Sequence, residues 1–296
     1  MRKHPVLFGL LLLGLLGVLF FLLVYGAAFL MGDRSTFTLK EKIGVVVLKG
    51  VILDSKAPLN ALERYSRDDG VKAIILRVES PGGGVSPAQE IHDKVQSVKK
   101  KKKVVVSMGS VAASGGYYVA CAADKIVANP GTVTGSIGVI MHFTNVQDLF
   151  KKIGLKSSVV KSGRYKDTGS PFRDMSPEEK ALLQGVLDDI HDQFLDTVSA
   201  GRGIPKEKLM AIADGRIMTG RQALQLGLVD YLGDIEFAAD VAAKLAGIEG
   251  KPELIYPKEE RFNIWRYMLE EAVSVLKREL TEEGVGFSYL YQTTED

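Results

Sequence analysis

The sequence is poor in the residues that build disulfides and metal sites. Its 296 residues include one cysteine, Cys121, and four histidines. A single cysteine cannot form an intramolecular disulfide, and it excludes a cysteine-based zinc site of the usual spacing. We therefore expect packing to hold the chain together, and we predict no metal or other cofactor.

The sequence also lacks an excess of charge of one sign. It has 38 lysines and arginines against 36 aspartates and glutamates, a formal charge of +2. Nucleic-acid-binding proteins usually carry a strong basic excess, so we predict no nucleic-acid partner. A hydrophobic share of 46% and a charged share of 25% are typical of a folded chain.

Apolar residues are concentrated in one run near the N-terminus. The run covers residues 6–31 and contains no charged side chain. A helix of this length, at about 1.5 Å per residue, would exceed the roughly 30 Å hydrocarbon core of a bilayer. We therefore predict a transmembrane anchor that contacts the lipid bilayer. The alternative is a cleaved signal peptide, whose apolar region usually spans only about 7–15 residues.

The charges that flank the run predict its orientation. Arg2 and Lys3 precede it and favour a cytoplasmic N-terminus over residues 1–5, with the rest of the chain outside the cytoplasm. Residues 32–42 are predicted to be a linker and residues 43–296 a folded domain. Within that domain, apolar residues at helical spacing in segment 258–296 predict either a docking or assembly helix with a tail, or an ordinary packing helix.

The remaining sequence predicts an α/β fold with mostly parallel strands. Short β-branched segments alternate with amphipathic stretches, which is typical of that fold class. Ser86 and Ser176, each followed by proline and then by glutamine or glutamate at the third helical position, predict helix N-caps. The expected strands are residues 43–48, 73–78, 104–108, 125–127, 136–140 and 157–160.

Three glycine-containing loops follow predicted strands, at residues 80–84, 109–116 and 131–136. Loops at the same ends of adjacent parallel strands converge, and glycines let a ligand approach the backbone closely. The alternative is that these are simply tight turns. None of the loops has the spacing of a phosphate-binding motif, so they do not predict nucleotide binding.

Ser114 is the candidate nucleophile in the second loop. Small residues flank it, and the apolar sequence YYVACAA, a predicted helix, follows. A serine at a helix N-terminus lies beside free N–H groups that can stabilise an oxyanion. A plain N-cap serine is an equally good interpretation of these residues alone.

A serine nucleophile needs a base, and the sequence offers two kinds. His92 and His142 lie near the loops, but the chain has no G-x-S-x-G motif. Lys161 and Lys166 lie in the irregular segment KSGRYKDTGSP. A lysine base must be neutral, which requires burial or nearby positive charge because its ordinary pKa is about 10.4. Asp167 would oppose this unless it points away from the lysine.

Four ordered motifs behind the apolar run resemble the signal peptide peptidase A family, in its short single-repeat bacterial form. They are SPGGGV, GSVAASGGYYVA, NPGTVTGSIGV and KSGRYKDTGSPFRDMSPEE, and the match covers residues 43–232. The resemblance implies a Clp-protease/crotonase-like spiral of β-β-α units. It also implies a serine endopeptidase with a Ser/Lys dyad that degrades remnant signal peptides at the outer face of the bacterial inner membrane. Such enzymes form homo-oligomeric rings.

The resemblance also assigns roles to individual residues. Ser114 matches the nucleophile, Lys166 the general base, and Ser136 the hydroxyl that hydrogen-bonds the lysine. The oxyanion hole is expected to use backbone N–H groups from two pairs, Gly82 or Gly83 and Gly115 or Ser114. Substrate is expected to bind in an extended form along the strand edge beside SPGGG.

Other functions share parts of this pattern. A crotonase-like acyl-CoA enzyme would have the same fold and oxyanion loops, but it needs a CoA-binding surface and has no need of an anchor. A Ser/His peptidase would keep Ser114 and use His142 as the base. A membrane scaffold without catalytic activity is the third alternative.

Overall fold

The computed structural model describes residues 14–23, 41–257 and 288–290. The chain divides into two compact units, Met1–Lys40 and Glu41–Asp296. In the first unit, residues 14–23 form a helix with exposed apolar side chains. Within the described ranges, no helix is both long and apolar enough to cross a bilayer. The remainder of the predicted span over residues 6–31 lies outside the described residues, so the span stays a prediction.

A largely parallel sheet forms the centre of the second unit. Its main path runs β7-β6-β4-β2-β1-β9, and β5 pairs with both β4 and β8. Every pairing within this sheet is parallel except that of β6 with β7. Its strands are β1 (Lys42–Lys49), β2 (Val71–Ser80), β4 (Lys103–Ala113), β5 (Lys125–Ala128), β6 (Val133–Gly135), β7 (Ile217–Thr219), β8 (Tyr231–Leu232) and β9 (Glu253–Ile255).

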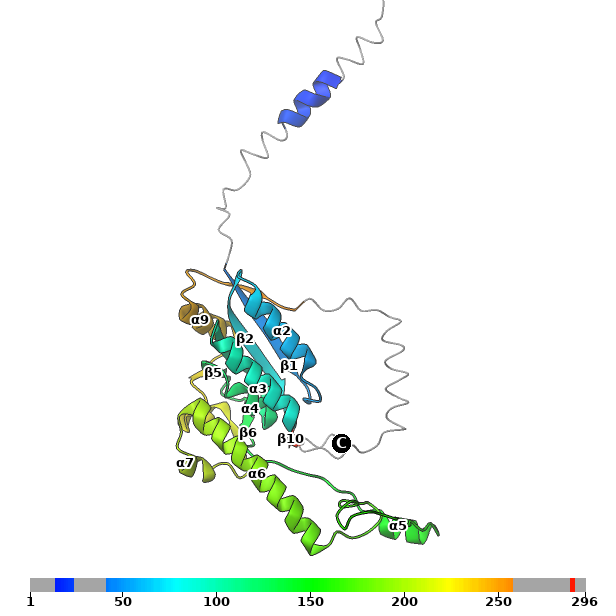
Figure 1. Cartoon of the computed structure of the whole chain (residues 1–296). Coiled ribbons are helices and arrows are strands. Elements are labelled where there is room, and N and C mark those ends of the chain that lie inside the picture. The colour runs from blue at the N-terminus through cyan, green and yellow to red at the C-terminus, as the bar shows by residue number, and fades with distance from the viewer. Residues whose placement is uncertain (1–13, 24–40, 258–287, 291–296) are drawn as a thin grey trace, which may run out of the picture. The chain divides into compact units, whose positions relative to one another are not determined.

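The helices of the second unit within the described residues are α2 (Lys56–Arg67), α3 (Val85–Lys99), α4 (Gly115–Ala120), α5 (Gln147–Lys152), α6 (Pro177–Arg202), α7 (Lys206–Met210), α8 (Gly220–Gln225) and α9 (Ile235–Ala246). Of these, α2 and α3 cover one face of the sheet and α9 covers the other. Figure 1 shows α2 and α3 side by side in front of β1 and β2. On β2, Ile74 and Leu76 join the cluster that contains α2 and α3, whereas Ala73 and Ile75 pack with α9. Because both faces are covered, the central strands are almost continuously apolar.

The structure confirms four of the predicted strands and overturns two. Residues 43–48, 73–78, 104–108 and 125–127 lie within β1, β2, β4 and β5. The prediction for 136–140 is wrong because a positive φ at Gly135 and at Ser136 ends β6 at Gly135. The prediction for 157–160 is also wrong: this segment is irregular and exposed. Its β-branched residues have no neighbouring strand to pack against.

The two predicted helix starts have different outcomes. Ser176 is confirmed as the N-cap of α6, with Pro177 in the first turn and a complete capping box that includes Glu179. The helix predicted at Ser86 is present as α3, but it begins at Val85, directly after the short strand β3 (Gly82–Gly84), so Ser86 is not its N-cap. The helix predicted within segment 258–296 lies outside the described residues, which in that segment include only β10 (Ser288–Leu290).

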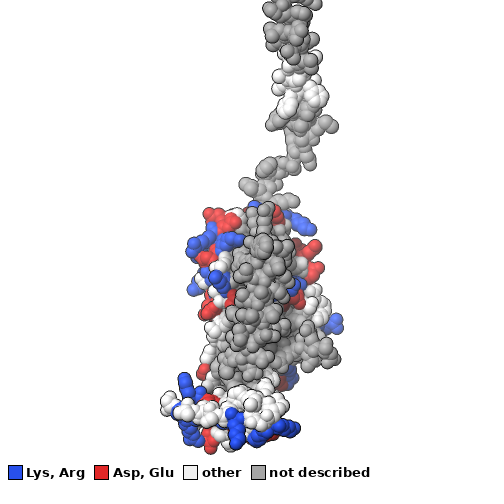
Figure 2. Space-filling model, turned by 90° about the vertical axis from the view of Figure 1, so that its right-hand side faces the viewer, with Lys and Arg blue, Asp and Glu red and all other residues white. Residues whose placement is uncertain are grey.

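In Figure 2, Lys and Arg side chains lie beside Asp and Glu side chains at the edges of the face that is shown.

Core packing makes a direct prediction for stability. Leu62 on α2 is fully buried, whereas Leu53 is 80% exposed. Leu62→Ala should lower the free energy of unfolding by about 2–5 kcal/mol, because it removes buried methyl groups and leaves a cavity. Leu53→Ala, the matched control, should change it by less than about 0.5 kcal/mol. Chemical denaturation measures both, and equal effects would contradict the assigned core.

Candidate active site

The three glycine-containing loops converge at the carboxyl ends of neighbouring strands. Ser80 of β2 is in register with Ala112 of β4, and Ala113 of β4 is in register with Gly135 of β6. A Cβ atom at Gly116 would lie only 2.9 Å from the carbonyl oxygen of Ser80, so the start of α4 lies against the first loop. The predicted convergence is confirmed, although residues 109–113 belong to β4 rather than to a loop.

A bulge in β4 sets the direction of the chain toward Ser114. The register changes from Val78 opposite Met108 to Ser80 opposite Ala112, so β4 has two extra residues. The Glu79 carboxylate accepts hydrogen bonds from the backbone N–H groups of Ser110, at 2.8 Å, and Val111, at 3.1 Å. A Cβ at position 109 would lie 1.6 Å from Glu79 Oε2, so a larger residue there would displace this carboxylate from the bulge.

Ser114 lies in a sharp turn between β4 and α4. Its φ of 51° and ψ of −116° place it in a region that residues with side chains rarely adopt. Its N–H donates to Gly135 O at 2.9 Å, and its carbonyl accepts from the Tyr118 N–H at 2.8 Å. Its side chain makes no capping hydrogen bond, which argues against the plain N-cap interpretation. Strained backbone is concentrated at functional sites, and a serine on a sharp strand-to-helix turn has the setting of a nucleophile, although the G-x-S-x-G pattern is absent.

Ser136 is the second serine held at a positive φ, of 49°. Its N–H donates to Arg216 O at 2.8 Å, and Gly135, the residue before it, accepts from the Ser114 N–H. Ser114 is 1% exposed and Ser136 7% exposed. Two buried serines in rare backbone conformations therefore lie at adjacent strand ends. Strain of this kind is concentrated at functional sites.

The hydrogen bonds of the backbone narrow the choice of oxyanion donors. The Ser114 N–H is engaged by Gly135 O, and the Gly82 N–H donates to Ser80 Oγ at 3.1 Å. The other two predicted donors are Gly83, which lies opposite Tyr289 of β10, and Gly115 at the start of α4. Contacts between β3 and α4 bring these two parts of the chain together.

The strand edge beside SPGGG accepts an extended segment. β10 pairs antiparallel with β3, so that Tyr289 lies opposite Gly83 and Leu290 opposite Gly82. The backbone of β3 therefore has the geometry for strand addition, which is the binding mode predicted for a substrate.

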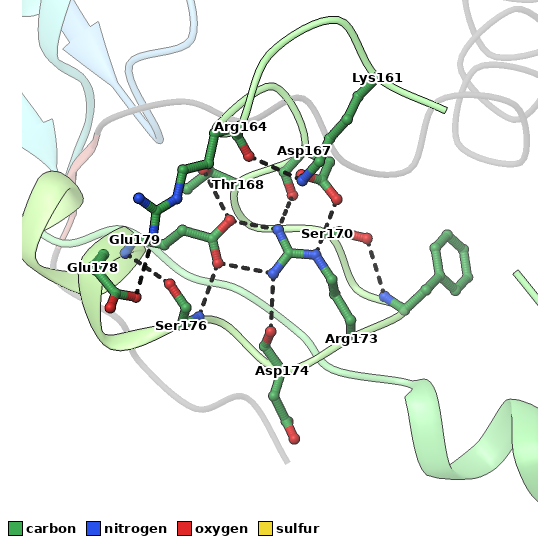
Figure 3. A network of polar contacts seen from close by, with 11 residues as sticks. Lys161, Arg164, Asp167, Thr168, Ser170, Arg173, Asp174, Ser176, Glu178 and Glu179 are labelled. Carbon is green, nitrogen blue, oxygen red and sulfur yellow. Dashed lines mark hydrogen bonds and ion pairs between the residues drawn. The ribbon is translucent and has the colours of Figure 1, made fainter. Parts of the chain in front are cut away.

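The two lysine candidates lie in the segment between α5 and α6 and have different surroundings. Lys161 belongs to the network of polar contacts in Figure 3. Lys161 Nζ donates to Arg164 O at 2.9 Å and pairs with Asp167. Asp167 also accepts from Arg173 Nε at 3.0 Å, and Arg173 and Lys161 together hold the pKa of its carboxyl well below the usual range. The side chain of Lys166 is exposed and makes no hydrogen bond or ion pair within the described part of the chain.

Within the described residues, the fold does not place the Lys166 side chain beside Ser114. Ser114 is buried at the end of β4, whereas Lys166 lies in an exposed stretch before α6. Figure 1 shows α5 beyond the N-terminal end of α6, away from the strands. The structure thus brings the two serines and the predicted glycines together, but not the predicted base.

The two histidines near the loops, His92 and His142, lie in different environments. His142 is exposed. His92 packs edge-on against Tyr118, with ring centroids 5.2 Å apart, and lies within 3.1 Å of an Asp93 oxygen. Burial lowers the pKa of His92. Neither histidine contacts Ser114 in the residues that the structure describes.

Sequence reasoning missed a cavity next to Ser136. This cavity of about 510 Å³ is lined by Ser136, Asp214 and one face of α6 that carries Gln184, Asp188 and His191. His191 Nε2 is buried and has no hydrogen-bond partner among the described residues. The spacing of these three residues places them on one helix face, which was the available sequence signal.

Comparison with known proteins identifies the family. Residues 96–249 match the model of peptidase family S49, and residues 42–134 match that of Clp protease. The chain belongs to peptidase family S49. The parallel-rich α/β fold of this S49 peptidase is consistent with the Clp-protease-like fold, and the resemblance to signal peptide peptidase A is confirmed.

Several relatives of this S49 peptidase carry protease names. It is 46% identical over 212 residues to a Synechocystis sp. protein with a provisional name as a protease, covering 71% of this chain and 76% of the relative. It is 38% identical over 187 residues to an Enterococcus faecium protein provisionally named signal peptide peptidase SppA, covering 63% and 54%. It is 34% identical over 219 residues to Protease 4 of Haemophilus influenzae, covering 71% and 35%.

The strain at Ser114 predicts an unusual response to glycine. Ser114→Gly should be about 1 kcal/mol more stable than Ser114→Ala, because glycine adopts positive φ without a steric cost. Ser110, which lies in β4 outside the positive-φ residues, is the control. There, glycine should be less stable than alanine by about 0.5–1 kcal/mol. Chemical denaturation of the four variants measures this, and the same sign at both positions would contradict the strain.

Proposed function

We propose that this S49 peptidase is a membrane-anchored serine endopeptidase that degrades remnant signal peptides, with Ser114 as nucleophile and Lys166 as general base. The observation that carries the proposal is the buried, strained Ser114 at the meeting point of three strand ends. The family match supports peptidase chemistry rather than the acyl-CoA alternative.

The proposed mechanism follows from the groups around Ser114. Neutral Lys166 takes the hydroxyl proton while Ser114 Oγ attacks the scissile carbonyl. The N–H groups of Gly83 and Gly115 stabilise the oxyanion, an effect worth about 3–4 kcal/mol for each donor. The lysine then protonates the leaving amine, and water hydrolyses the acyl-enzyme by the same route.

Lys166 fits the role of base better than Lys161 does. The Lys161 amine already contacts the Asp167 carboxylate and the carbonyl oxygen of Arg164. The Lys166 amine has no such partner in the described chain. In the proposed dyad, Ser136 accepts a hydrogen bond from this amine and orients it.

The dyad requires the Lys166 amine to contact the hydroxyl of Ser114. A ring of identical chains would allow this contact between Lys166 of one copy and Ser114 of its neighbour. The stretch that precedes Lys166 exposes a set of large apolar side chains: Leu149, Ile153, Leu155, Val159 and Val160. Exposed apolar patches of this kind typically mark protein interfaces. We therefore include in the proposal a homo-oligomeric ring in which Lys166 of one copy serves Ser114 of the next.

Single substitutions test the dyad. Ser114→Ala and Lys166→Ala should each abolish cleavage of a signal-peptide substrate while the circular dichroism spectrum and melting temperature stay close to those of the wild type. His142→Ala, the control for a histidine base, should retain nearly full activity. Peptidase activity that survives in Lys166→Ala would rule out the lysine base.

Mixing the two inactive variants tests the shared site. In a ring assembled from equal amounts of Ser114→Ala and Lys166→Ala chains, about a quarter of the sites receive an intact serine and an intact lysine from different copies. Activity should recover to about that fraction after the two proteins are dissociated and reassembled together. No recovery, in mixed rings detected by two different tags, would show that each chain completes its own dyad.

Deletion of the apolar segment tests the anchor. The full chain should sediment with membranes and resist extraction by high salt, because a span of about 20 or more apolar residues is held by the hydrophobic effect. A chain without residues 1–31 should be found in the soluble fraction after cell lysis. If it stays with membranes, some other part of the molecule makes the attachment.

A further inference from the structure

We propose that Arg173 is a positioning residue for Lys166. It clamps Asp167, the neighbour of Lys166, to Glu179 at the start of α6, and so turns the Asp167 carboxylate away from the lysine amine. This inference rests on the proposed function of Lys166 as the base.

The guanidinium of Arg173 has every donor in use (Figure 3). Nε donates to Asp167 Oδ2 at 3.0 Å, and Nη2 donates to the backbone oxygen of the same residue at 3.1 Å. Nη1 donates to Glu179 Oε2 at 2.8 Å and to Asp174 O at 3.0 Å, and Nη2 also donates to Glu179 Oε1. These are the five N–H groups of an arginine, and their planar fork has no equivalent in lysine.

Glu179 is the fixed end of this clamp. It is 4% exposed and belongs to the capping box of α6, where it accepts the Ser176 N–H at 2.9 Å. Arg173, followed by the Ser176 N–H, lowers the pKa of Glu179 from an ordinary value of 4.5 to about 2. The stabilisation by this carboxylate is therefore fully present above pH 4.5 and is lost only as the pH falls toward 2. The clamp stays charged in the range where a neutral lysine can act.

Without Arg173, the Asp167 carboxylate would be free to approach the amine of its neighbour Lys166. A carboxylate near Lys166 would stabilise the ammonium form and oppose the neutral base. The charged groups that face Asp167 are Arg173, which bridges to Glu179 of α6, and Lys161 from its own segment. Arg164 and Glu178 form a separate pair outside these contacts, with nitrogen and oxygen 4.0 Å apart and both side chains largely exposed. With Asp167 held by two cations, the amine of Lys166 forms no ion pair with any carboxylate among the described residues.

Arg173→Gln tests the clamp on the full-length protein. The glutamine keeps part of the side chain but releases Asp167, so kcat for a signal-peptide substrate should fall about 10²-fold, as expected for a base displaced by about 1 Å. KM should change little. The rise of kcat/KM with pH should shift upward by about one unit, because the freed carboxylate raises the pKa of the lysine. A merely structural role would lower activity without moving the pH profile.

A double substitution and a control substitution test whether the Asp167 carboxylate is the group through which Arg173 acts. Arg173→Gln combined with Asp167→Asn should return the pH profile to its wild-type position, since the freed charge is gone. Arg164→Lys, at the exposed arginine of the same segment, should leave both kcat and the pH profile unchanged. If Arg173→Gln does not fold, Arg173→Lys keeps the charge without the fork and should show the same upward shift in smaller size.

The outcomes separate this inference from the proposed function. A wild-type pH profile in a folded Arg173 variant, with Lys166→Ala inactive, would overturn the positioning role alone. An active Lys166→Ala would overturn the proposed function instead. A shift that persists after Asp167→Asn would show that the aspartate is not the group that Arg173 controls.

Discussion

The pairing of β4 between β2 and β6 is the constraint on which the candidate site depends. It brings the carboxyl ends of three strands together, and the Ser114 N–H bond to Gly135 O fixes the turn at the end of β4. The Glu79 carboxylate holds the bulge that precedes this turn. A rare backbone conformation at a non-glycine residue persists only when the surroundings overdetermine it, and here two neighbouring strands do so.

The groups proposed for catalysis come from two parts of the chain, the strand ends around Ser114 and the segment before α6. Strand ends provide a buried serine, a second buried serine and glycine N–H groups. In the described part of the chain, the Ser114 side chain makes no hydrogen bond with a lysine or a histidine. The polar segment before α6 carries the lysines, and its charges are sorted so that Asp167 faces Lys161 and Arg173 rather than Lys166.

The central strands and the convergence of the loops could be predicted from sequence because they depend on local patterns. Runs of apolar β-branched residues gave β1, β2 and β4, and the Ser-Pro-Glu-Glu sequence gave the start of α6. The strand predicted at 157–160 failed because β-branched composition does not supply a pairing partner. The bulge opposite Glu79 and the strain at Ser114 depend on contacts between distant residues, which no local pattern encodes.

The choice of the catalytic base also depends on side-chain contacts that the local sequence pattern does not encode. Sequence reasoning left Lys161 and Lys166 as alternatives before the resemblance was considered, because the direction of the Asp167 side chain decides between them. That direction is set by Arg173 and by Glu179 on α6, six and twelve residues further along the chain. The cavity beside Ser136 was missed because its polar face on α6 meets the loops only in the folded domain.

If Lys166 activates Ser114, the rate at which a serine-directed phosphonate labels the protein depends on this lysine. Mass spectrometry should identify Ser114 as the modified residue, and the labelling rate should rise with a single ionisation toward alkaline pH. In Lys166→Ala, labelling should be lost. Labelling that keeps its rate and pH dependence in Lys166→Ala would show that Lys166 does not activate Ser114.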